Sequence, residues 1–203
     1  RPAPKTEALT NHEMEGLGLE GRWIAVMGSG QVEPGHPVYR LAEACGRVLA
    51  EAGWGVVTGG YFGVMEAASR VARAAGGRVA SVPCREFRRD RIHPYADTVL
   101  WTDRYEDRIR TLCEVAHGYW VLPGGIGTMA ELFYTWSMAQ LRYPRHKPVI
   151  LVGPQWPAIL EGWRQHLLIP EGDWRYVQWA GDPTEALTLL EQHLRDAPGD
   201  SLG

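Results

Sequence analysis

The chain has 203 residues, of which 45% are hydrophobic and 22% are charged, and its formal net charge is −3. This length and composition fit one globular domain with a sizeable core and exclude disorder over most of the chain. The small net charge gives no sign of a nucleic-acid partner, and no apolar run approaches the length of a membrane span. The cysteines Cys45, Cys84 and Cys113 are widely spaced and form no CxxC pair. With no signal peptide recognised, we therefore expect a cytoplasmic protein without a disulfide framework.

Two residue types that often carry chemistry are rare or scattered in this chain. Only two lysines are present, Lys5 and Lys147, so a Schiff-base mechanism such as pyridoxal-phosphate chemistry has almost no candidate. The seven histidines form no HxH or HxxxH pair. We therefore expect neither a metal site nor a cofactor.

Short apolar runs alternate with amphipathic stretches from residue 22 onward. In chain order they predict a strand over 23–27, a helix over 37–52, a strand over 55–58, a helix over 64–75, strands over 78–82 and 98–101, a helix over 104–116, a strand over 119–122, a helix over 128–141, a strand over 148–152, a helix over 156–168, a strand over 176–179 and a final helix opening at 182–185. An irregular, Arg-rich stretch over 85–94 interrupts the alternation.

This alternation predicts an α/β fold, a Rossmann-like doubly wound parallel sheet with helices on both faces. The strands are nearly continuous apolar runs, which suits a sheet buried on both sides. We expect one nucleotide-binding domain over 22–195, preceded by a tail or lead-in helix over 1–21 and followed by a tail over 196–203.

Three of the predicted strands run into glycine-rich loops, which begin at Gly28, Gly59 and Pro123. In a parallel sheet these loops share one edge, where backbone N–H groups and helix N-termini bind anions. Glycines that only form tight turns are the alternative for each loop by itself. The chain lacks GxxxxGK[ST] and a complete GxGxxG, which favours a single nucleoside phosphate over a dinucleotide. The residues predicted to contact it are Gly28, Ser29, Gly59, Gly60, Gly63, Met65, Glu66, Gly124, Gly125, Gly127 and Thr128.

Three charged side chains near these loops each allow a structural and a functional interpretation. Thr128 and Glu131 fit the capping box [ST]xxE, so Glu131 either closes a helix cap or faces the sugar of the ligand. Glu66 either positions the ligand or opens a helix. Arg108 lies in the charge-dense stretch 103–110, which by pattern alone is typical of a solvated helix face.

These residues resemble the Lonely Guy (LOG) family, whose members are often labelled lysine decarboxylases. The sequence PGGIGTMAE at 123–131 matches the family motif PGGxGTxxE, and 59–68 is similar to its second motif, GGGxxGxMEAA, with Tyr61 in place of the third glycine. The arginine of the family's Arg-Lys pair lies fifteen residues before the PGG proline, which is Arg108 here, while Ile109 replaces the lysine.

The resemblance implies a Rossmann-like fold, a homodimer or larger assembly, and hydrolysis of the N-glycosidic bond of nucleoside 5′-monophosphates such as AMP or cytokinin-type nucleotides. It also implies that Arg108 and Glu131 are the catalytic pair. Glycosidases use carboxylates at an oxocarbenium-like centre, so Glu131 suits the reaction, while Arg108 could bind phosphate or orient Glu131. We would place Trp136 at a subunit contact. The lysine count opposes the decarboxylase label.

The resemblance leaves two other functions open. It extends to molybdenum-cofactor carrier proteins, so a non-catalytic nucleotide or molybdenum-cofactor binding protein of the same fold is the main alternative. A nucleotide-sensing regulatory module is the third.

Overall fold

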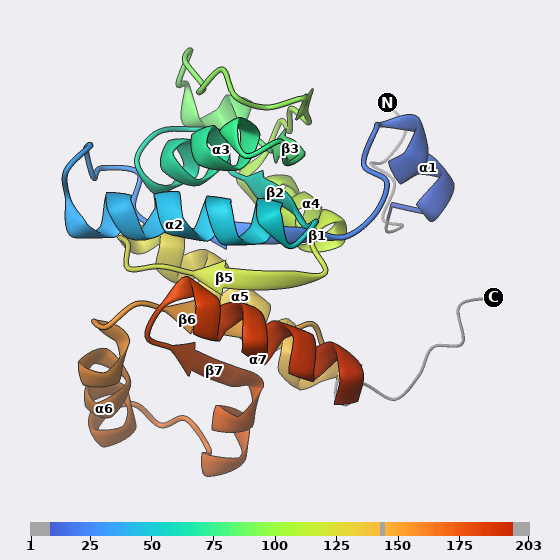
Figure 1. Ribbon diagram of the computed structural model, residues 1–203. Coiled ribbons are helices and arrows are strands. Elements are labelled where there is room, and N and C mark those ends of the chain that lie inside the picture. Colours follow the sequence, from blue (N-terminus) through green and yellow to red (C-terminus); the bar gives the residue numbers. More distant parts are fainter. Residues whose placement is uncertain (1–8, 143–144, 197–203) are drawn as a thin grey trace.

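The computed structural model describes residues 9–142 and 145–196, which form one seven-stranded, all-parallel sheet (Figure 1). The strand order is β4-β3-β2-β1-β5-β6-β7. The strands are β1 (Trp23–Met27), β2 (Gly55–Thr58), β3 (Val79–Ser81), β4 (Thr98–Val99), β5 (Gly118–Val121), β6 (Val149–Val152) and β7 (Val177–Ala180). The predicted parallel sheet is confirmed.

Helices cover both faces of this sheet. They are α1 (Asn11–Gly16), α2 (Pro37–Glu51), α3 (Val64–Ala74), α4 (Tyr105–Val115), α5 (Ile126–Arg142), α6 (Trp156–His166) and α7 (Pro183–Asp196), with short 3₁₀ helices η1 (Arg85–Phe87) and η2 (Glu171–Tyr176). Figure 1 shows α2, α3 and α7 on one face and α4 and α5 behind the sheet. Among the described residues, no helix is long and apolar enough to cross a membrane.

The sheet separates two apolar cores, as strands with a side-chain period of two require. In β1, Ile24 and Val26 face the core that α2, α3 and α7 cover, whereas Ala25 and Met27 face the core under α4, α5 and α6. All five residues of β1 are therefore buried, and because both faces of the strand are covered its sequence is an unbroken apolar run.

Among the residues before β1, Leu19 packs into the core under α4, α5 and α6. Thr10 and Glu13 form a capping box that starts α1, and Leu19 is fully buried. The first eight residues of the predicted lead-in, and the predicted C-terminal tail beyond residue 196, lie outside the described residues.

Trp136 is not at the surface where we expected a subunit contact. Its indole is buried, donates through Nε1 to the Asp173 carbonyl (2.9 Å), and packs edge-on against Trp174 with ring centroids 5.3 Å apart. The prediction for this side chain is wrong because its partners lie in η2 of the same chain.

The strand order creates the place for a ligand. From β1 the chain builds outward to β4 on one side, and then returns to add β5, β6 and β7 on the other. The loops after β1 and β5 therefore lie next to each other at the carboxyl edge, where open α/β sheets bind their ligands.

Candidate functional site

Ser29 joins the three glycine-rich loops at the carboxyl edge. Its backbone N–H donates to the Pro123 carbonyl (3.1 Å), and its own carbonyl accepts from the Val64 N–H (2.9 Å). A Cβ on Gly124 would lie 2.8 Å from the Ser29 nitrogen, so only glycine allows the first and third loops to approach this closely. The loops therefore form one continuous surface.

A cavity of about 410 Å³ opens at this surface. Nine of the thirteen predicted site residues line it: Gly28, Ser29, Gly59, Met65, Arg108, Gly125, Gly127, Thr128 and Glu131. The cavity brings together side chains from α3, α4 and α5 that are far apart in the sequence.

Four predicted site residues do not line the cavity. Gly60 adopts a φ of 86° beside Ser81, and Gly63, the N-cap of α3 with a φ of 64°, packs against the backbone of the first loop. Gly124 packs closely against Ser29 and Thr128. Glu66 lies in the first turn of α3. These positions shape or begin elements beside the cavity.

Arg108 and Glu131 form a buried ion pair between α4 and α5. Arg108 Nη1 donates to Glu131 Oε1 (2.8 Å), and the two residues are 4% and 7% exposed. Arg108 Nε also donates to the Val82 carbonyl (3.1 Å), which fixes the guanidinium. The solvated-face interpretation of 103–110 is therefore correct for Arg104 and Glu106, which are exposed, and wrong for Arg108.

The capping-box interpretation of Glu131 does not describe this structure. The α5 helix begins at Ile126, so Thr128 already lies within its first turn. The Glu131 carboxylate accepts a hydrogen bond from Arg108, which lies on another helix. Glu131 is therefore free of a capping role and faces the cavity.

Two opposing influences act on the Glu131 carboxyl group. Burial raises its pKa above the ordinary value, and the nearby Arg108 charge and hydrogen bond lower it, with burial the larger effect. A raised pKa makes Glu131 a stronger base than an exposed glutamate while Arg108 still favours the ionised form.

Among the cavity-lining side chains that sequence reasoning missed are Phe87, Arg89 and Tyr105. Phe87 lies between two other rings, with centroids 5.9 Å from Tyr61 and 5.1 Å from Tyr105. The available signals were the Arg-rich composition of 85–94 and the tyrosine in place of a motif glycine.

The described part of the chain offers no donor set for a metal or a Schiff base at this cavity. No group of three His, Cys, Asp or Glu side chains in residues 9–142 and 145–196 could hold a metal ion. Lys147, the described lysine, is not in the cavity lining and donates to the Cys113 carbonyl. Backbone amides, Arg108 and Glu131 are therefore the groups that a ligand meets.

A family model and a curated relative both place this chain among LOG-like proteins. Residues 22–166 match the SLOG cluster4 family. The chain is 30% identical over 140 residues to a cytokinin riboside 5′-monophosphate phosphoribohydrolase of Mycobacterium tuberculosis, covering 68% of this chain and 74% of that protein.

Two solved structures resemble the fold. The molybdenum cofactor carrier protein of Chlamydomonas reinhardtii has a TM-score of 0.66 and 26% identity, over 87% of this chain and 99% of the carrier. The molybdenum cofactor binding protein of Rippkaea orientalis has a TM-score of 0.68 and 23% identity, over 86% of this chain and 98% of that one. The match over 22–166, which contains the glycine loops, Arg108 and Glu131, shows that the chain belongs to the LOG-like SLOG cluster4 family.

Proposed function

We propose that the chain is a phosphoribohydrolase that hydrolyses nucleoside 5′-monophosphates to a free base and ribose 5-phosphate. One observation carries the proposal: a buried carboxylate, Glu131, faces the same cavity as the glycine-rich start of its own helix, and Arg108 holds it in place. This is the arrangement in which an anion at the helix start brings an attached sugar to a carboxylate.

The start of α5 is the phosphate site in this proposal. Gly125, Gly127 and Thr128 line the cavity, and the N–H groups of a first helical turn have no partners within the helix. The positive end of the helix dipole favours an anion at the same place. Glu131 follows Thr128 by about one helical turn, so the ribose of a bound nucleotide would lie against its carboxylate.

The reaction then needs one water molecule. The bond between ribose C1′ and the base nitrogen breaks, its electron pair leaves with the base, and C1′ acquires oxocarbenium character that the Glu131 carboxylate stabilises. Water attacks C1′, and Glu131 accepts the proton that the water loses. The departing base takes up a proton from solvent, Glu131 releases to solvent the proton that it accepted, and the products are the free base and ribose 5-phosphate.

Arg108 acts in this proposal by orienting Glu131. Two of its donor groups are already used, Nη1 by the Glu131 carboxylate and Nε by the Val82 carbonyl. Such a fixed guanidinium keeps the carboxylate ionised and in one position. The phosphate is then bound by the backbone of the glycine-rich loop that begins at Pro123 and leads into α5, which we call the α5 loop.

A non-catalytic carrier is the second candidate, and the likeness to the Chlamydomonas molybdenum cofactor carrier favours it. Such a carrier would use the same phosphate-binding loop and would need no ionised carboxylate at the sugar. Turnover of a nucleotide separates the two functions.

The test follows release of free base and ribose 5-phosphate from AMP and other nucleoside 5′-monophosphates. We expect hydrolysis by the wild type and a loss of about 10²–10⁴-fold in kcat for Glu131→Gln. Glu66→Gln is the matched control, because Glu66 lies on α3 outside the cavity lining, and it should retain activity. Binding without hydrolysis by the wild type would instead favour the carrier.

The assembly and the location also belong to the proposal. Ile126, Phe133, Tyr134 and Leu141 are exposed apolar residues of α5, and they support a homodimer that buries this helix face. Cys45, Cys84 and Cys113 are all free thiols, in keeping with a cytoplasmic enzyme.

A further inference from the structure

Tyr61 fixes the start of the Arg-rich segment, which we define as residues 84–93. The Tyr61 ring is buried, and its hydroxyl donates to the Cys84 carbonyl (3.0 Å) while accepting from the Cys84 N–H (3.0 Å). Both polar groups of the Cys84 backbone are thereby satisfied by one side chain. A glycine at position 61, as in the family motif, could not make these bonds.

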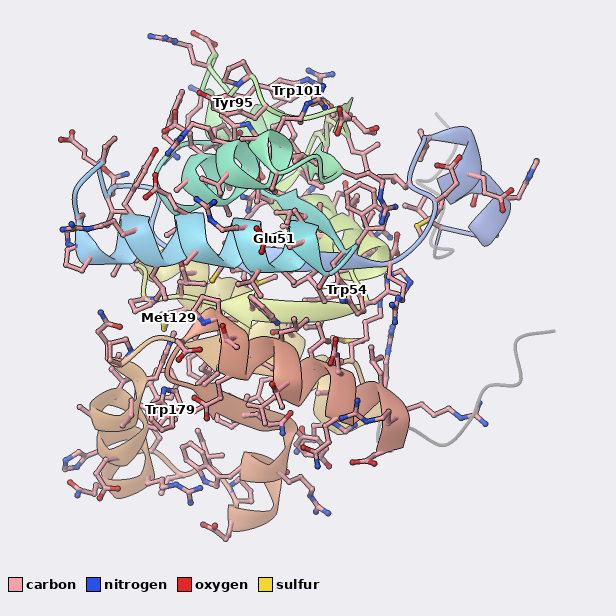
Figure 2. All side chains as sticks on the ribbon, viewed as in Figure 1. Glu51, Trp54, Tyr95, Trp101, Met129 and Trp179 are labelled. Atoms are coloured by element: carbon pink, nitrogen blue, oxygen red, sulfur yellow. The ribbon has the colours of Figure 1, made fainter. Side chains whose placement is uncertain are left out.

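The other end of segment 84–93 is attached to the same glycine loop. The His93 N–H donates to the Gly60 carbonyl (3.0 Å). The His93 ring is buried, with Nε2 within hydrogen-bond distance of Ser81 Oγ (3.3 Å) and Thr58 Oγ1 (3.4 Å). Figure 2 shows Tyr95 and Trp101, which follow this segment, in the connection beyond α3. Because both ends are fixed, the segment has a defined position over the cavity.

Segment 84–93 brings an aromatic ring and a cation to the cavity. Phe87 and Arg89 line it, together with Tyr105 from the start of α4. The Arg89 guanidinium carbon lies 5.2 Å from the Tyr61 ring centroid and 5.8 Å from that of Phe87. In the described part of the chain, Arg89 makes these ring contacts and no ion pair, so its donors are available to a ligand.

These groups are separate from those assigned to phosphate and sugar. The α5 loop, Arg108 and Glu131 serve the phosphate and ribose in the proposed function. The rest of the lining is largely apolar and includes the rings of Tyr61, Phe87 and Tyr105, with the Gln31 amide and the Arg89 guanidinium among its polar side chains. A planar base suits ring surfaces, on which it stacks. A guanidinium offers only donors, so it recognises an edge with two neighbouring acceptors.

We infer that Phe87 and Arg89 bind the base of the nucleotide and select a 6-oxopurine, hypoxanthine or guanine, over adenine. O6 and N7 of an oxopurine are adjacent acceptors that match the fork of Arg89, whereas adenine places an amino donor beside N7. The inference rests on the proposed orientation of the nucleotide, with its phosphate at α5.

The test compares IMP, GMP and AMP as substrates of the wild type, Arg89→Met and Arg89→Gln. We expect kcat/KM for IMP and GMP to exceed that for AMP by about tenfold or more in the wild type. Arg89→Met should bring the ratio close to one. Arg89→Gln should turn the preference toward AMP, since a glutamine amide pairs with N6 and N7 of adenine.

Two controls make the result specific to the base. Ribose 5-phosphate carries the phosphate and sugar without a base, so its inhibition constant should be the same in the wild type and both Arg89 variants. Arg88→Asn removes a neighbouring arginine outside the cavity lining, and asparagine tolerates the left-handed φ of 51° at that position. This variant should keep the wild-type preference.

The outcomes distinguish this inference from the proposed function. Equal kcat/KM values for IMP and AMP in the wild type, or weaker ribose 5-phosphate inhibition in Arg89→Met, would overturn the inference. If no nucleotide is hydrolysed, calorimetric affinities for IMP and AMP replace kcat/KM. An IMP preference that disappears in Arg89→Met would then uphold base selection while the hydrolase proposal fails.

Discussion

Arg108 reaches Glu131 only because residue 59 has no side chain. A Cβ on Gly59 would overlap Arg108 Nη2 and come 2.9 Å from Met65 Sδ. We therefore predict that Gly59→Ala displaces the guanidinium and lowers kcat by about 10²-fold, comparable to a misplacement of about 1 Å at a reacting group. Gly162→Ala, in the middle of α6 with no atom near the added Cβ, is the matched control. Steady-state kinetics on both variants, with thermal melting to check folding, makes the comparison; full activity in Gly59→Ala would refute it.

The raised pKa of Glu131 gives the proposed reaction a characteristic acid limit. Activity needs the ionised carboxylate, so kcat/KM should fall as the pH drops through a pKa above the ordinary glutamate value. Arg108 lowers that pKa, so Arg108→Met should move the acid limb to higher pH. The phosphate group of the substrate titrates identically with both enzymes, so the difference between their profiles reports Glu131. Coincident acid limbs would contradict this assignment.

The attachment of segment 84–93 to the sheet depends on a neutral histidine. Burial lowers the pKa of His93 to about 4, so between about pH 6.5 and 4 the unfolded chain binds a proton that the folded chain does not. Stability should therefore fall as the pH is lowered through this interval. His117, whose pKa is also lowered to about 4, contributes in the same direction.

We predict that His93→Gln loses part of this pH dependence. The free energy of unfolding of the wild type should drop by about 2 kcal/mol more than that of His93→Gln between pH 7.5 and 4.5. Urea denaturation at the two pH values measures the difference. His166→Gln, which changes an exposed histidine near the end of α6, should behave as the wild type does. An equal drop in wild type and His93→Gln would show that the His93 ring does not carry the effect.

Elements with local signals were predictable from the sequence to within about two residues. Pro37 begins α2 and Gly53 follows its end, and an apolar run defines β1 with both bounds correct. The α5 helix begins two residues before the predicted start, because Thr128 and Glu131 resemble a helix cap although the helix already includes Gly127. Local patterns therefore locate elements well and fix their ends less well.

The candidate site was predictable where it depends on the loops and not where it depends on long-range contacts. Glycine-rich loops after parallel strands indicated the cavity from pattern alone, whereas Arg108 came only from its spacing in the family motif. The Arg-rich composition of 85–94 and the tyrosine at position 61 did not place Phe87 and Arg89, because their position at the cavity depends on the contact between Tyr61 and Cys84, 23 residues apart. An irregular segment has no period from which such a contact can be read.

At the scale of the whole molecule, the described residues leave one helix face uncovered. Ile126, Phe133, Tyr134 and Leu141 lie on one side of α5, since at about 100° per residue they fall within an arc of about 100°. Ile126 and Leu141 are 90% and 75% exposed. Ile126 also lines the cavity, so a second copy packed on this face would narrow the cavity entrance. Covering α5 would therefore link assembly to the water exclusion that the proposed reaction needs.

We predict that the protein is a dimer in solution and that Leu141→Glu makes it monomeric, because the carboxylate would have to be buried without a partner in the interface. Light scattering coupled to size-exclusion chromatography at micromolar concentration measures the mass. Val99→Glu is the control, since Val99 is an exposed apolar residue of β4, at the edge of the sheet far from β5 and β6, on which α5 packs. A wild type that is monomeric, or a Val99→Glu variant that dissociates as readily as Leu141→Glu, would rule out α5 as the interface. If α5 is the interface, kcat/KM of Leu141→Glu should fall together with the dimer fraction, because the cavity entrance opens when the partner leaves.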